Sequence, residues 1–84
     1  MKYREIYSIV IADEQSGVAN PRYRTPKEKV TAIWQLVFSH GYKEETNLTK
    51  EDAYWLACEL YEDMTGRYFD ATEEEYEQML REIH

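Results

Sequence analysis

The sequence predicts a small, mainly α-helical domain of three to four helices. Two observations carry this prediction. Threonine capping signatures recur at Thr25, Thr49 and Thr72. Each precedes apolar residues at the i, i+3, i+4, i+7 spacing of an amphipathic helix. The predicted helices lie near residues 3–16, 26–40, 50–65 and 73–83, in a single domain that spans residues 1–84.

The N-terminal segment permits two interpretations. As a helix, it places five apolar residues on one face, closed by Gly17: Tyr3, Ile6, Tyr7, Val10 and Ile11. As a strand, residues 3–11 alternate and are rich in strand formers, with residues 18–24 as the partner strand. Pro21 weakens that pairing, and Glu5 falls among the apolar residues of the strand. A helix is therefore favoured, and a β-hairpin stays open as the alternative.

The second helix begins after Thr25, which is followed by Pro26 at the first helical position and by Glu28 three residues after the cap. Gly41 suits a left-handed C-terminal cap, so the helix is expected to end at residue 40. Its apolar face comprises Val30, Ile33, Trp34 and Val37.

The last two helices carry similar signals. Thr49 is followed by Asp52, and Thr72 by Glu75 in a full capping box, in which hydroxyl and carboxylate each accept a backbone N–H. Gly66 marks the end of the first of them. The core of the domain is expected to contain Val30, Ile33, Trp34, Val37, Leu56, Leu60, Met79, Leu80 and Ile83.

Charge is unevenly divided along a chain whose net charge is −7. Residues 1–42 hold six basic and four acidic residues, whereas residues 43–84 hold four basic and thirteen acidic ones. Such an acidic half repels the phosphates of nucleic acid and anionic membrane surfaces, and it attracts basic proteins. No direct binding to nucleic acid or membrane is therefore expected, although solubility alone would also account for the charge.

Other features concern the cellular compartment. The longest apolar run covers only residues 9–12, which is too short to span a bilayer. Residues 1–5 do not resemble a secretory signal. Cys58 is the single cysteine, which rules out an internal disulfide and fits a reducing compartment. The sequence thus predicts a cytoplasmic protein.

Catalysis, metal binding and cofactor binding have little support. His40 and His84 are the only histidines, and no closely spaced pair of His or Cys ligands exists. Cys58 is followed by Glu59, and carboxylates near a thiol raise its pKa and lower its reactivity. We therefore expect no enzyme, no metal and no cofactor.

The most informative surface is the side of the 50–65 helix opposite its apolar face. Trp55 lies there among carboxylates, and tryptophan is enriched at interface hot spots. In the alternative interpretation, Trp55 packs under the N-terminal segment or residues 43–48, and the acidic faces are only solvated. The predicted partner-binding residues are Glu51, Trp55, Glu59, Glu62, Asp63, Glu74 and Glu77.

These features suggest a non-enzymatic acidic module that inhibits a basic partner by occupying its nucleic-acid-binding site. The partner would be a nucleic-acid-processing enzyme such as a nuclease, an effector of phage defence or a polymerase. In size, acidity and helical content the chain resembles colicin-type nuclease immunity proteins and small acidic phage inhibitors at the level of class. The paired-tyrosine motif of the immunity proteins is absent, so no residue role carries over. The alternative is a structural or adaptor module, or a homo-oligomer, with no inhibitory role.

Overall fold

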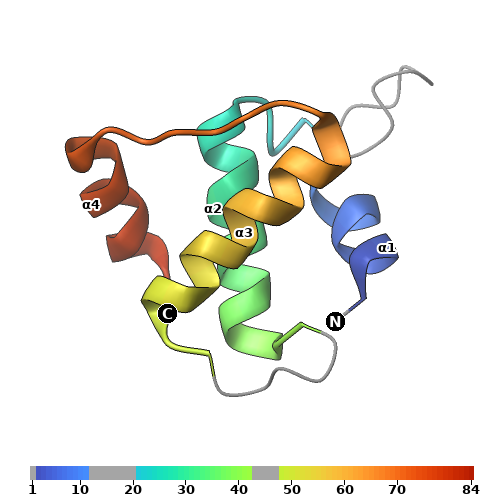
Figure 1. Cartoon of the computed structure of the whole chain (residues 1–84), viewed down its shortest axis with the longest axis horizontal. Coiled ribbons are helices and arrows are strands. Elements are labelled where there is room, and N and C mark those ends of the chain that lie inside the picture. The colour runs from blue at the N-terminus through green and yellow to red at the C-terminus, as the bar shows by residue number, and fades with distance from the viewer. Residues whose placement is uncertain (1, 12–20, 43–47) are drawn as a thin grey trace.

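A computed structural model describes residues 2–11, 21–42 and 48–84. It confirms the predicted fold class: the described residues form a compact all-α domain without strands. Figure 1 shows α3 crossing over α2, with α1 and α4 on opposite sides of this pair. The elements are α1 (Tyr3–Ile6), the π-helical turn η1 (Tyr7–Ile11), α2 (Pro26–His40), α3 (Lys50–Thr65) and α4 (Glu73–Glu82).

The N-terminal segment is helical from Tyr3 to Ile11, so the hairpin alternative is wrong. Residues 12–16 of the predicted helix, and Gly17 after them, lie outside the described residues. The second half of the segment is a π-helix, which the apolar spacing did not predict. In a π-turn the backbone hydrogen bonds join residues five apart. Ile6 and Ile11 are five apart, and both are buried.

The three threonine caps form as predicted, but the reciprocal bond from the acid forms only in α4. There Glu75 accepts the Thr72 N–H at 3.2 Å. In α2, the Glu28 carboxylate instead accepts a hydrogen bond from the Thr25 hydroxyl at 2.9 Å. In α3, the acid is Asp52, whose side chain is one methylene shorter than that of glutamate and does not make the reciprocal bond. In each helix the threonine hydroxyl accepts the N–H of the residue three positions on, at 3.1–3.2 Å: Thr25, Thr49 and Thr72.

The predicted ends of α2 and α3 are confirmed. Both helices stop at a glycine with positive φ, 76° at Gly41 and 71° at Gly66. The α4 helix ends at Glu82, one residue before the predicted end, because Ile83 turns to an extended backbone with φ −88° and ψ 122°. This turn leaves the Ile83 side chain buried.

The core is centred on α2, which packs against α3, α4 and η1. Two of the predicted core residues, Leu56 and Leu80, are only partly buried. The buried face of α3 includes Ala53 and Ala57, whose small side chains let helices approach closely. Because Tyr54 is also buried, this face is rotated away from Leu56 and toward Tyr54. The other predicted core residues are buried: Val30, Ile33, Trp34, Val37, Leu60, Met79 and Ile83.

Polar bonds hold α4 against α2. The ammonium of Lys27 donates to Gln78 Oε1 at 2.7 Å. Gln35 bonds twice to the backbone of His84: its Oε1 accepts the N–H at 2.8 Å, and its Nε2 donates to the carbonyl at 3.3 Å. Lys27, near the start of α2, bonds to the middle of α4, and Gln35, later in α2, bonds to the residue after α4. The two helices therefore run in the same direction.

Burial separates two leucines of α3 that the sequence treats alike. Leu60 is 3% exposed and Leu56 is partly exposed. Leu60→Ala should lower the free energy of unfolding by about 2–5 kcal/mol, because it leaves a cavity in the core. Leu56→Ala should cost less. Urea denaturation followed by circular dichroism measures both, and equal losses would contradict the placement of Leu56.

Candidate partner-binding groove

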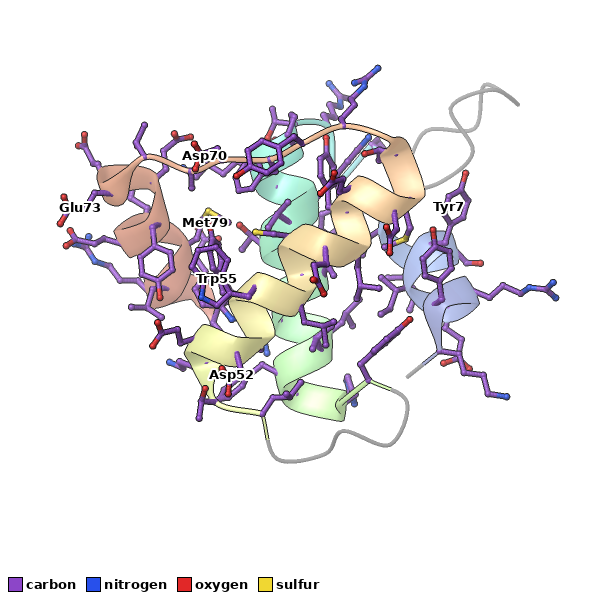
Figure 2. All side chains as sticks on the ribbon, viewed as in Figure 1. Tyr7, Asp52, Trp55, Asp70, Glu73 and Met79 are labelled. Atoms are coloured by element: carbon purple, nitrogen blue, oxygen red, sulfur yellow. The ribbon has the colours of Figure 1, made fainter. Side chains whose placement is uncertain are left out.

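An open groove of about 500 Å³ lies between α3, the connection of residues 66–72, and α4. Figure 2 shows Trp55 on α3, Asp70 on the connection and Glu73 at the start of α4. The lining residues are Glu51, Tyr54, Trp55, Cys58, Glu59 and Glu62 of α3, residues 68–71 of the connection, and Glu73 and Tyr76 of α4.

The α3 wall of the groove follows from helical periodicity. Five of its residues occur at i, i+4, i+7, i+8 and i+11, so they share one face of the helix. Four of the five are exposed, and these four are predicted partner-binding residues. The five residues are Glu51, Trp55, Cys58, Glu59 and Glu62.

Trp55 is 61% exposed, so the alternative interpretation in which it is buried is wrong. Its indole has one ring neighbour, Tyr54, at 5.2 Å between centroids with the planes 67° apart. Tryptophan is enriched at the hot spots of protein interfaces, so an exposed indole in a groove marks a candidate contact surface. Trp55 therefore presents an accessible indole at the groove.

Beneath Trp55, three aromatic rings from three helices meet. Trp34 of α2 packs edge-on against Tyr54 of α3 at 4.9 Å and stacks on Tyr76 of α4 at 5.7 Å. Tyr54 and Tyr76 also touch edge-on at 4.9 Å. The Trp34 indole N–H donates to the carbonyl of Lys50 at 2.9 Å, which ties it to the first turn of α3. The groove therefore has a fixed aromatic floor.

The connection contributes a second exposed aromatic residue, which is not among the residues predicted from the sequence. Tyr68 is 77% exposed. The adjacent Phe69 is partly buried and packs against Tyr61 at 6.1 Å, which anchors the connection to α3. One sequence feature could have indicated that the connection lines the groove. Tyr68 and Phe69 form an aromatic pair directly before Asp70, between two predicted helices.

Negative charge dominates the groove. No Lys, Arg or His is among the described residues that line it. The lining carboxylates are Glu51, Glu59, Glu62, Asp70 and Glu73. The groove therefore combines an aromatic floor with a negatively charged rim.

Three of the predicted partner-binding residues lie outside the groove: Asp63, Glu74 and Glu77. Each is exposed and directly follows a lining residue: Glu62, Glu73 or Tyr76. Neighbouring residues on a helix point about 100° apart, which turns these side chains away from the groove. Asp63 instead lies near α1. Partial burial and then the Asp63 carboxylate raise the pKa of the Tyr3 hydroxyl.

Cys58 is a half-buried free thiol in the wall of the groove. Burial raises its pKa, the nearby Asp70 carboxylate raises it further, and a hydrogen bond with Tyr54 acts in the opposite direction. Burial also raises the pKa of Tyr54 well above its ordinary value, with the hydrogen bond to Cys58 as the next cause. At neutral pH both groups are therefore protonated.

Across residues 2–11, 21–42 and 48–84, no three His, Cys, Asp or Glu side chains form a group that could hold a metal ion. Within the same residues, no helix has the length and apolar character needed to cross a membrane.

The pH dependence of Cys58 alkylation should report its surroundings. With iodoacetamide, the rate should rise with pH to a midpoint above that of an ordinary thiol, measured from about pH 7 to 11. Asp70→Asn should move the midpoint to lower pH, because it removes a negative charge that disfavours the thiolate. Asp63→Asn serves as the control and should leave it in place. An unchanged midpoint in Asp70→Asn would contradict this arrangement.

The two tryptophans should differ in their contribution to stability. Trp55→Ala removes an exposed indole with one ring contact, so it should lower the free energy of unfolding by less than about 1.5 kcal/mol. Trp34→Phe removes the bond to Lys50 from the buried cluster and should cost about 1–3 kcal/mol. Denaturant titrations compare the two variants. A larger loss for Trp55→Ala would show that its indole supports the fold.

No family model, curated protein or solved structure matches this chain. The chemistry of the groove is therefore the basis on which a function can be argued. That chemistry consists of exposed aromatic rings and carboxylates on a fixed helical frame.

Proposed function

We propose that this protein is a non-enzymatic binding module whose groove accepts a basic region of a partner protein. The observation that carries the proposal is an indole, 61% exposed, in a groove with five lining carboxylates and no cation among its described lining residues. The aromatic surface would provide desolvated contact area, and the carboxylates would attract and orient the partner.

The partner should be a protein and not a nucleic acid. Carboxylates repel phosphates, and the chain carries a net charge of −7. A protein that binds nucleic acid presents lysines and arginines for phosphates, and carboxylates along α3 and the connection can replace the phosphates at those positions. Occupation of such a site would exclude the nucleic acid. The protein would then act as an inhibitor of a nucleic-acid-processing enzyme.

A crosslinking experiment tests this proposal. A photoreactive benzoylphenylalanine replaces Tyr68, which is 77% exposed beside the groove, and in a control variant it replaces Ile9, which is 41% exposed on η1. Light-induced crosslinks formed in the native host cell are mapped by mass spectrometry. The Tyr68 variant should capture a protein at a Lys/Arg-rich surface that the Ile9 variant does not capture.

The captured partner is then purified, and its binding to nucleic acid is titrated with this protein. The wild type should displace the nucleic acid, and Trp55→Ala should bind the partner more weakly by about 2 kcal/mol or more, as hot-spot truncations do. Crosslinks between two copies of this chain would overturn the proposal and favour the homo-oligomer. Equal binding by wild type and Trp55→Ala would also overturn it.

A further inference from the structure

We propose that the groove takes an extended, arginine-bearing segment of the partner, with a guanidinium group against the Trp55 indole. This inference rests on the function proposed above and adds the conformation and the side chain of the occupant. Three features of the groove support the inference: the exposed indole beside carboxylates, the length of the α3 wall, and the backbone of residues 68–71.

The rings and carboxylates together favour arginine. A guanidinium group is planar and weakly hydrated, so it can stack on an indole while it donates two parallel hydrogen bonds to a carboxylate. Trp55 provides the exposed indole, and Glu51 and Glu59 lie one turn before and after it on the same face. Lysine is a compact, strongly hydrated charge and cannot make both contacts in one plane.

The length of the groove favours an extended occupant. Its α3 wall runs from Glu51 to Glu62, which is about 16 Å at 1.5 Å per residue. An extended chain rises about 3.3 Å per residue, so about five residues fill this length. Alternate side chains of such a segment would point to the same side, toward the aromatic floor.

Residues 68–71 of the connection provide extended backbone along the wall of this space. Figure 1 shows it running from the end of α3 across the top of the domain to α4. Among the described residues, residues 68–71 form no backbone–backbone hydrogen bond. An extended segment can pair with such a wall through its own backbone, as in strand addition.

Nuclear magnetic resonance titration tests the inference without the natural partner. The probe is the capped peptide Ac-Gly-Arg-Gly-Arg-Gly-NH2, compared with otherwise identical peptides that carry lysine or the uncharged isostere citrulline. The arginine peptide should shift the indole N–H signal of Trp55 and the amide signals of residues 68–71. The indole signal of Trp34 is the internal control, because this N–H is already bonded to Lys50.

We expect the arginine peptide to bind at least about threefold more tightly than the lysine peptide and about tenfold more tightly than the citrulline peptide. Matched variants locate the site. Glu62→Gln should weaken binding, whereas Asp63→Asn, which removes the same charge one residue away, should not. Likewise, Glu73→Gln should weaken binding more than Glu74→Gln. Circular dichroism confirms that each variant folds.

Two outcomes would overturn the inference. Equal affinity for the arginine and lysine peptides would show that the groove responds to charge alone. In the second outcome, the amide signals of Asp63 and Glu74 shift as much as those of residues 68–71, and the Trp55 indole signal does not move. That result would show that the peptide is not in the groove. Neither outcome affects the crosslinking test of the proposed function, because that test depends on the whole partner surface and not on arginine.

Discussion

The contact on which the rest of the structure depends is the packing of Trp34 between two tyrosines. Its indole is fully buried, touches Tyr54 of α3 and Tyr76 of α4, and donates its N–H to the carbonyl of Lys50. A small domain has few such opportunities to bury a large side chain. This one residue of α2 therefore sets the positions of both helices that flank the groove. The groove exists because α3 and α4 each meet Trp34, while the connection between them stays at the surface.

Part of this arrangement could be predicted from the sequence. The capping threonines and the two glycines predicted the limits of α2 and α3, because caps and turns with positive φ depend on residues adjacent in sequence. Only Gly66 adopts the left-handed conformation expected of both glycines, since Gly41 has ψ 174°. Helical periodicity likewise predicted that Trp55 faces away from the core. Such features need no knowledge of how the helices pack.

The remaining features depend on tertiary structure, and the sequence did not predict them. The π-turn at Tyr7 cannot be recognised from apolar spacing, because the same residues also fit an ordinary helix. The groove depends on how α4 packs: Gln35 of α2 binds the backbone of His84 at the end of α4, and α4 meets α3 through the contact of Tyr54 with Tyr76. Asp63, Glu74 and Glu77 also lie outside the groove, because each points about 100° around its helix from the lining residue that precedes it.

The crowding of five carboxylates around one groove has a consequence for the lifetime of the protein. The cationic partner proposed above would bind to this carboxylate-lined groove, which only the folded chain provides. Binding to the folded state alone then raises the free energy of unfolding by mass action. Proteases act on the unfolded chain, so copies without a partner would be degraded sooner than occupied ones. If the proposed partner binds in this way, the cellular amount of this protein would follow the supply of that partner.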